Sequence, residues 1–470
     1  MLLPALLAAF VAAPALAQDE ERVAVNAAPP AEEPAAAAED TTASGWSANM
    51  LQKSIVIQHI RPNDRRGLNV FEPPKDDGVP FTGFRLDVGA AFTQQFQALE
   101  HSNTAIAVNS TVNGQQVNNN QLMEIGNGFN NATANLYVNA QLAPGIRVAL
   151  ATYLSSRHHR ETWVKDGYLL VDESPIRHPA LDAIMDYVTL RVGHFEINYG
   201  DAHYRRTDNG HAMFNPFVGN YIMDAFTTEI GAEAYVRRGP WMVMGGVTGG
   251  EIRGTVTTPN ARSRAYLGKV GFDQQLTPSL RLRLTGSIYT TDKAASNTLY
   301  GGDRAGSRYY MVMENTQAAE NNQFTSGLLN PGFANQVTAW QINPFVKFHG
   351  LELFGVIEQA EGRRTAEADD RQFNQYAIDG VYRFMRDRLY VGARYNTVEG
   401  RLASQVNGVW TDWAGDVSID RTQFGAGWFV TPTILLKGEY VTQRYNDFPT
   451  TDIRNGGKFN GFVMEGVVAF

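Results

Sequence analysis

The last segment of the chain, residues 459–470, alternates between two kinds of side chain. One set is apolar and carries an aromatic at each end, Phe462 and Phe470, whereas the other set carries the only charge, Glu465. A period of two is the pattern of a β-strand with two different surroundings. An apolar face bounded by aromatics over about 9–11 residues is what a strand needs to cross a bilayer. The segment therefore predicts a membrane-spanning strand.

The same alternation recurs along the chain and is interrupted in two ways. Short runs of two to four turn residues, most of them with Pro or Gly, set tight reversals at 142–146, 237–241, 276–280, 348–351, 384–389 and 430–434. Between them lie long polar connections at 98–130, 199–226, 292–335, 362–370, 401–416 and 445–458. Short turns that alternate with long loops are typical of an outer-membrane barrel, in which the short turns are periplasmic and the long loops face outward.

The pattern predicts an all-β fold, a transmembrane antiparallel β-barrel of 16 strands. Segment 161–171 has the weakest alternation, but parity requires it, because without it strand 227–238 would run the wrong way into the turn at Gly239. The predicted strands are 83–95, 131–142, 145–156, 161–171, 186–198, 227–238, 240–251, 263–275, 279–291, 336–348, 350–361, 371–384, 388–400, 417–429, 433–444 and 459–470.

The two faces of the predicted strands can be assigned by charge. Leu282 and Leu284 alternate with Arg281 and Arg283. An Arg or Lys on the lipid face at mid-bilayer costs about 2–4 kcal/mol, so these arginines must face water inside the barrel. A barrel of this size is wide enough to hold an aqueous channel. The same parity predicts these pore-lining residues: Arg147, Arg191, Arg281, Arg283, Arg394, Lys437 and Glu439.

The predicted inner wall carries 11 basic and 9 acidic side chains. Rings of Arg or Lys select anions, whereas mixed walls create a transverse field that filters solutes by polarity and size. We therefore expect a weak preference for anions. The basic set is Arg85, Arg147, Arg191, Arg237, Lys269, Arg281, Arg283, Lys347, Arg383, Arg394 and Lys437. The acidic set is Asp87, Glu229, Glu233, Asp273, Glu352, Glu358, Asp379, Glu439 and Glu465.

Two features resemble known families. The aromatic C-terminal strand ending at Phe470 resembles the last strand of Gram-negative outer-membrane barrel proteins. The phrase Arg191-Val-Gly-His-Phe195, followed by loop 199–226, resembles the phosphate-selective and related substrate-specific porins. That resemblance implies a homotrimer in the outer membrane, in contact with the lipid bilayer and lipopolysaccharide, which passes small hydrophilic solutes and uses no cofactor. The concentrated basic ladder of the phosphate type is absent, so phosphate specificity is not predicted.

Loop 199–226 is the third outer loop in the predicted order, and in the porins that it resembles this loop folds inward and narrows the barrel. It is rich in apolar side chains, including Met213, Phe217, Tyr221 and Ile222, which need a wall to pack against. We therefore expect the loop to form the pore constriction. The expected constriction residues are Arg205, Arg206, Asp208 and His211.

The sequence before residue 83 differs in composition from the barrel. Residues 1–17 read as a signal peptide cleaved before Gln18, although a basic start is missing; an uncleaved anchor helix is the alternative. Residues 18–45 form an acidic Ala/Pro-rich linker that cannot bury enough apolar surface to fold. We place 46–82 in the periplasm, with a possible plug segment, and assign 83–470 to the barrel.

Charge and motif searches narrow the function classes. The chain of 470 residues has a net charge of −8 and no cysteine, and the acidic linker holds most of that charge, so the nearly neutral barrel offers no case for nucleic acid. A barrel hydrolase using an outer-loop Asp–His pair is the enzyme alternative, but no Gly-x-Ser-x-Gly or His-Glu-x-x-His motif occurs. The candidate histidines are His158, His159, His178, His194, His203, His211 and His349, and a metal site would use His203, His211 and Asp201.

Three non-enzymatic alternatives remain beside the general channel. A channel specific for sugars or organic acids would use luminal aromatics as a binding slide. A soluble surface protein would carry charges on both strand faces, and a long-chain lipid transporter would need a hydrophobic N-terminal hatch, whereas 46–82 is strongly charged. The reading that fits most features is a passive porin for small hydrophilic solutes.

Overall fold

The structure is a computed structural model of the chain, and it describes residues 60–75, 81–130, 132–155, 162–252, 256, 258–301, 308–319, 325–406 and 408–470. The expected signal peptide, the acidic linker and residues 46–59 lie outside the described residues, as do His158 and His159. The domain boundaries therefore stay a prediction.

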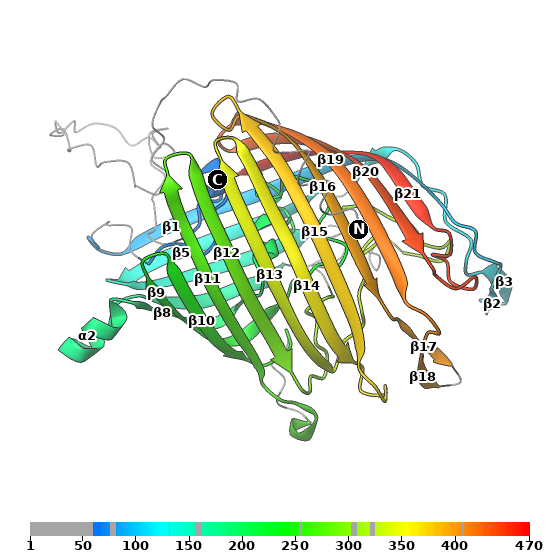
Figure 1. Cartoon of the computed structure of the whole chain (residues 1–470), viewed down its shortest axis with the longest axis horizontal. Coiled ribbons are helices and arrows are strands. Elements are labelled where there is room, and N and C mark those ends of the chain that lie inside the picture. The colour runs from blue at the N-terminus through cyan, green and yellow to red at the C-terminus, as the bar shows by residue number, and fades with distance from the viewer. Residues whose placement is uncertain are drawn as a thin grey trace, which may run out of the picture.

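Sixteen antiparallel strands close into a barrel, as the sequence predicts (Figure 1). β1 pairs with β21 over Ala91–Ala469 to Ser102–Lys458, which closes the ring. The weak segment forms a wall strand, β7. The two-residue β4 (Gly128–Phe129) adds to β1. The wall strands are β1 (Arg85–Ser102), β5 (Thr133–Ala143), β6 (Ile146–Ser155), β7 (Trp163–Val171), β8 (Val188–Glu196), β9 (Thr228–Arg238), β10 (Trp241–Thr248), β11 (Ala265–Thr277), β12 (Leu280–Thr291), β13 (Gln336–Phe348), β14 (Leu351–Arg363), β15 (Arg371–Phe384), β16 (Leu389–Gly400), β19 (Val417–Thr431), β20 (Ile434–Asn446) and β21 (Lys458–Ala469).

The two ends of the barrel differ in their connections. Most turns at one end are only a few residues long; Gly145 in the β5–β6 turn has φ +62°, which favours glycine. We call this the short-turn end, and by the barrel pattern it is periplasmic. Its one longer connection, between β7 and β8, holds α2 (Pro179–Met185). The opposite, long-loop end carries the small hairpins β2 (Asn109–Val112)–β3 (Gln115–Asn118) and β17 (Ala403–Val406)–β18 (Val409–Asp412), far from α2 in Figure 1.

The strand faces follow the predicted alternation. Leu284 and Ile288 on the outer face of β12 are 53% and 46% exposed, whereas Arg281 and Arg283 on its inner face are 8% and 6% exposed. On β21 the apolar side chains of Phe462, Met464 and Phe470 face outward and Glu465 is buried inside. The outer surface is thus apolar and the inner wall polar, as a strand between hydrocarbon and water requires. Within the described ranges, no helix is long and apolar enough to cross a membrane.

Much of the barrel interior is filled by three segments that are not wall strands. The first is the β8–β9 connection, residues 199–226, which we call the inner loop and which begins with the 3₁₀ turn η3 (Ala202–Arg205). The second is the β12–β13 connection, whose described part buries Tyr309 and Leu329. The third is residues 60–75, which we call the strap and which includes the 3₁₀ turn η2 (Arg65–Gly67). These segments and the wall form the apolar clusters of the interior.

Candidate functional site

The inner loop folds into the barrel, as the sequence predicts. Its first residues bind the wall strands β11 and β12. The Asp201 carboxylate accepts hydrogen bonds from Arg283 Nε at 2.8 Å and Thr285 Oγ1 at 2.9 Å, and Lys269 Nζ lies 2.7 Å from it. The Gly200 N–H donates to Ser287 Oγ at 2.8 Å. The loop is therefore fixed where it leaves β8 by direct contacts with the wall.

The middle of the inner loop is fixed on the opposite wall by Lys437 and Glu439 of β20. Lys437 is 5% exposed, and its Nζ donates to three loop carbonyls, those of Ala212 at 2.8 Å, Asn215 at 3.0 Å and Phe217 at 2.6 Å. Glu439 accepts from the Val218 N–H at 2.8 Å and from the Gly219 N–H at 3.3 Å. Both side chains thus hold the loop through its backbone groups, while Lys437 also lies 3.0 Å from Glu465.

Arg394 of β16 holds the next part of the loop. Its guanidinium makes a paired contact with Asp379 at 2.7 and 2.8 Å and donates to the Gly219 carbonyl at 3.0 Å. It also lies 4.1 Å from the ring centre of Tyr221. The Tyr221 hydroxyl donates to the same Asp379 carboxylate at 3.0 Å. The wall pair and the loop therefore form one buried network.

The remaining predicted wall cations near the inner loop contact the strap or acids of the wall. Arg281 donates to the Asn69 carbonyl at 3.0 Å and pairs with Asp273 at 2.6 Å. Arg205 of the inner loop lies 3.5 Å from Glu352 and also donates to Asn69. Five of the predicted pore-lining residues thus bind the inner loop or the strap; these are Arg281, Arg283, Arg394, Lys437 and Glu439.

An internal cavity of about 250 Å³ lies between the inner loop, the strap and the wall of β5 to β9. Among the predicted site residues, Arg147, Arg191, Arg206, Asp208 and His211 line this cavity, whereas Arg205 does not. Its wall contributes six cationic and five acidic side chains. These are Arg61, Arg147, Lys165, Arg191, Arg206 and Arg237, with Glu72, Asp166, Asp172, Glu196 and Asp208. The lining is therefore mixed in charge, with basic groups slightly ahead.

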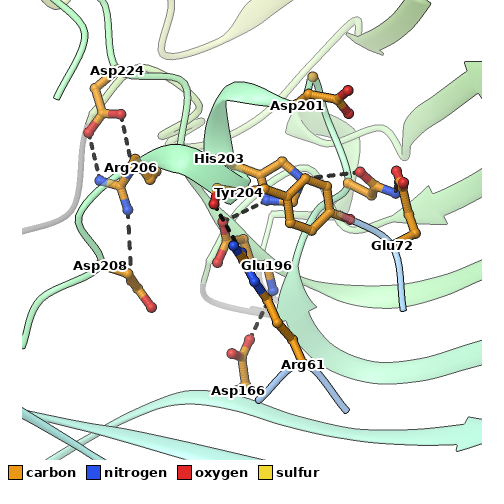
Figure 2. A network of polar contacts seen from close by, with 12 residues as sticks. Arg61, Glu72, Asp166, Glu196, Asp201, His203, Tyr204, Arg206, Asp208 and Asp224 are labelled. Atoms are coloured by element: carbon orange, nitrogen blue, oxygen red, sulfur yellow. Dashed lines mark hydrogen bonds and ion pairs between the residues drawn. The ribbon is translucent and has the colours of Figure 1, made fainter. Parts of the chain in front are cut away.

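Lys165 of β7 organises the acidic side of the cavity. Its Nζ lies 3.0 Å from Asp166, 2.5 Å from Glu196 and 3.3 Å from Asp208. Arg206 stands beside this group and pairs with Asp224 at 2.6 Å while lying 3.7 Å from Asp208, as Figure 2 shows. One lysine is thus shared by three carboxylates, which leaves this side of the cavity with excess negative charge.

Other cavity cations have different partners. Arg191 pairs with Glu233, with Nε at 2.9 Å from the carboxylate, and Arg147 pairs with Asp172. Arg237 donates to Thr189 Oγ1 at 3.1 Å, and its guanidinium lies 5.0 Å from the Tyr235 ring centre. Within the described residues, Arg237 makes no ion pair with a carboxylate within 4.0 Å. The cavity therefore holds both cations that are paired with a carboxylate and a cation that is not.

The two histidines of the inner loop are uncharged at neutral pH. His203 Nδ1 lies 3.0 Å from Glu196 and Nε2 lies 3.1 Å from Asn198 Oδ1, while burial lowers the pKa of His203. Burial, together with the nearby Arg61 charge, lowers the pKa of His211 to about 3. Neutral histidines leave the charge balance of the cavity to its Arg, Lys, Asp and Glu side chains.

The residues considered for a hydrolytic Asp–His pair or a metal site have other partners in the structure. Asp201 contacts Arg283 and Lys269, and His211 meets Asp208 through their backbones at 2.8 and 3.0 Å. In the part of the chain that the structure describes, no three His, Asp or Glu side chains gather as a metal site would need.

The sequence pattern missed three charged side chains that line the cavity, Arg61, Glu72 and Lys165. Arg61 and Glu72 lie in the strap, before the first strand, where no alternation identifies an inward side. Lys165 lies on β7, whose alternation is the weakest of the predicted strands. The phrase at 191–195 pointed toward this region, because Arg191 and Glu196 border the same cavity.

The comparison with protein families agrees with a porin. The family described as phosphate-selective porin O and P matches residues 171–404, which include the inner loop. No relative was found among curated proteins. Solved structures with a similar course include an anion-selective porin from Comamonas acidovorans, 12% identical, covering 82% of this chain and 100% of that chain with a TM-score of 0.47.

Two further solved structures are similar. The trimer form of OmpT, an outer membrane protein of Vibrio cholerae, is 11% identical and covers 83% of this chain and 100% of that chain, with a TM-score of 0.46. The outer membrane channel DcaP of Acinetobacter baumannii is 9% identical and covers 83% and 98%, with a TM-score of 0.45. The closed sixteen-stranded barrel and the family match over residues 171–404 identify this chain as an outer-membrane porin, a diffusion channel that resembles the phosphate-selective porins O and P.

Proposed function

We propose that solutes cross this porin through the cavity between the inner loop and the β5–β9 wall, and that the channel weakly prefers small anions. The observation that carries the proposal is the mixed lining of that cavity, in which cations slightly outnumber acids. Charges facing one another across a narrow passage create a transverse field that orders polar solutes and their water. A slight excess of positive charge favours anions without excluding cations.

The cavity volume limits the solutes. About 250 Å³ lies below the roughly 300–1,000 Å³ of pockets that enclose drug-sized molecules, so the passage suits ions and small hydrophilic solutes. The proposed constriction uses Arg206, Asp208 and His211 from the inner loop, facing Arg147 and Arg191 on the wall. Arg205 instead supports the loop from behind, through Asn69 and Glu352.

We further propose that the protein acts as a channel without catalysis. A general base needs a side chain within hydrogen-bond reach of a substrate proton. The Asp201 carboxylate is occupied by Arg283, Lys269 and Thr285, and the nearest acid to His203 is Glu196, which Lys165 also holds. These groups serve to position the inner loop.

The native assembly is proposed to be a homotrimer in contact with lipid and lipopolysaccharide. Support comes from the resemblance to porins and from the trimer form of the Vibrio cholerae protein. Cross-linking of the protein extracted in mild detergent should give a species of three chains, whereas a monomer throughout would contradict the proposal.

Ion preference can be measured in a planar bilayer with a gradient of potassium chloride. We expect a reversal potential that indicates a modest excess of chloride over potassium permeability. Liposome swelling with a graded series of sugars and organic anions should show rates that fall with solute size. A strong cation preference would contradict the anion proposal. Uptake of one solute far above others of equal size would instead favour a substrate-specific channel.

A further inference from the structure

We propose that the strap, residues 60–75, is a built-in part of the pore that narrows its short-turn end, and that Arg61 of the strap is a specificity-determining residue for anions. This inference rests on the proposed solute path through the cavity. It assigns a transport role to a segment that precedes the first wall strand.

The strap runs across the barrel mouth from one side to the other. The Arg65 N–H donates to the Pro432 carbonyl at 2.9 Å, in the β19–β20 turn. Farther along, the Asn69 carbonyl accepts from Arg281 of β12 at 3.0 Å. Lys75 then lies 3.9 Å from Asp172 at the end of β7. These contacts belong to widely separated parts of the ring, so the strap spans the opening rather than following one wall.

A buried ion cluster holds the strap in this position. Glu72 lies 2.8 Å from Lys269 Nζ and 2.6 Å from Arg283 Nη2, and it also accepts from Asn198 at 3.0 Å. The side chains of Glu72, Lys269 and Arg283 are 4%, 0% and 5% exposed. Because the same two cations bind Asp201, the strap and the inner loop share one anchor. Figure 2 shows Glu72 and Asp201 on the same side of the polar network around His203 and Glu196.

Apolar packing adds to the ion cluster. Phe71 is 2% exposed, and its ring lies 5.8 Å from Tyr204 of the inner loop and 5.4 Å from Phe345 of β13. The Arg283 guanidinium also lies 4.2 Å from the Phe71 ring centre. A buried aromatic at an edge-to-face distance fixes orientation as well as position. The strap is therefore a packed element of the interior.

Arg61 carries the charge that the strap brings to the cavity. Its Nε donates to the Gly67 carbonyl at 2.9 Å and its Nη1 donates to the Tyr204 carbonyl at 3.0 Å. The guanidinium lies 3.6 Å from the Phe214 ring centre. Among the described residues, no carboxylate lies within 4.0 Å of it. Backbone carbonyls and a ring thus orient this cation without neutralising it.

The position of Arg61 gives it influence over permeating ions. Burial lowers the pKa of Arg61 to about 9, which leaves the side chain charged at neutral pH. A unit charge at about 5 Å in a water-like medium changes the local concentration of a monovalent ion about fourfold. Removal of the Arg61 charge should therefore reduce anion preference measurably, although the other cations of the cavity remain.

The chain contains no cysteine, so a cysteine introduced by mutation is the only thiol that a reagent can modify. Arg61→Cys should lower the ratio of chloride to potassium permeability by about twofold to fourfold in a planar bilayer. Trimethylammonium-ethyl methanethiosulfonate puts a positive charge on the thiol and should restore the ratio. The sulfonatoethyl reagent adds a negative charge and should lower the ratio further. A merely structural residue would not respond to the sign of the added charge.

Arg238→Cys is the matched control, because Arg238 is exposed at the β9–β10 turn. The same reagents should leave its permeability ratio unchanged. A thiol at position 61 that reacts with neither reagent, or that reacts without a change in the ratio, would overturn the role of Arg61. Should Arg61→Cys not assemble, Arg61→Gln and Arg61→Lys provide the same contrast, with only the lysine variant keeping the anion preference.

The narrowing is tested by release of the strap. Glu72→Gln combined with Phe71→Ala removes the charge and the ring that hold it, and single-channel conductance should rise. Unchanged conductance would overturn the constriction. Failure of the proposed function is distinguishable, because in that case the wild-type porin itself would show no anion preference or no current.

Discussion

The Arg394–Asp379 pair provides a quantitative test of how the inner loop is held. Arg394→Met removes a guanidinium that lies 2.7 and 2.8 Å from Asp379, with both side chains 0% exposed. The substitution leaves a buried carboxylate whose remaining hydrogen-bond donor, among the described residues, is the Tyr221 hydroxyl. Removal of one partner of a buried pair costs about 3–5 kcal/mol. We therefore expect the free energy of unfolding to fall by about that amount.

The double variant separates the charge effect from the loop contact. Arg394→Met with Asp379→Leu removes both charges of the pair, and such apolar replacements are often neutral, although the Tyr221 hydroxyl then loses its acceptor. The Gly219 carbonyl still loses its donor from Arg394, which costs about 1–3 kcal/mol. We expect the double variant to be more stable than the Arg394→Met variant and to conduct more than the wild type, because the inner loop is held less tightly.

Denaturant unfolding in lipid vesicles, followed by the fluorescence of the 7 tryptophans, measures these differences. Arg388→Met is the control, because Arg388 is exposed in the turn before β16, and surface changes of this kind stay within about 0.5 kcal/mol. If Arg394→Met lowers stability no more than the control, or if the double variant is the least stable of the three, the reasoning about this pair is wrong.

Three further predictions concern the inner loop and the lipid face. Lys437→Met removes the donor to three loop carbonyls and should raise single-channel conductance and its noise; a trace identical to wild type would show that the loop is held without it. Burial, with Arg61 nearby, lowers the pKa of His211 to about 3, whereas a free histidine titrates near about 6.5. The unfolded chain therefore takes up this proton first, so stability is full above about pH 6.5 and falls by up to about 1.4 kcal/mol per unit as pH drops toward 3. His211→Asn should flatten that slope in denaturant midpoints measured from pH 7 to 4, and equal slopes would contradict the assignment. Leu284→Arg on the lipid face should cost about 2–4 kcal/mol in folding into vesicles, whereas Thr290→Arg on the same face near the loop end should cost only about 0–1 kcal/mol; equal costs would contradict the depth assignment.

The sequence alone was sufficient for the wall of the barrel. The alternation of Leu284 with Arg283 identified the lipid and luminal faces. Hydrocarbon penalises a charge on the lipid face, so Arg283 must lie on the luminal face and its neighbour Leu284 on the lipid face. Parity required the weak β7 strand, because both ends of an even-numbered barrel lie on one side of the membrane. These are local rules that need only neighbouring residues, so they can be read before any fold is known.

The inward fold of the loop also followed from a local signal. Met213, Phe217, Tyr221 and Ile222 are too apolar for an outer loop, and each is at most 2% exposed inside the barrel. Apolar side chains in a connecting segment require a partner surface, and inside a closed barrel that surface is the wall. The sequence did not show which wall residue would meet which part of the loop.

Tertiary structure alone decided which inward charges bind the inner loop or the strap and which border the cavity. By alternation Lys437 and Arg147 are equivalent, yet Lys437 binds the Phe217 carbonyl, 220 residues away, whereas Arg147 borders the cavity. The strap carries no strand pattern, and Glu72 finds Arg283 across 211 residues. The physical reason is that a period of two fixes the side on which a side chain lies, while its partner depends on the path of segments distant in the chain.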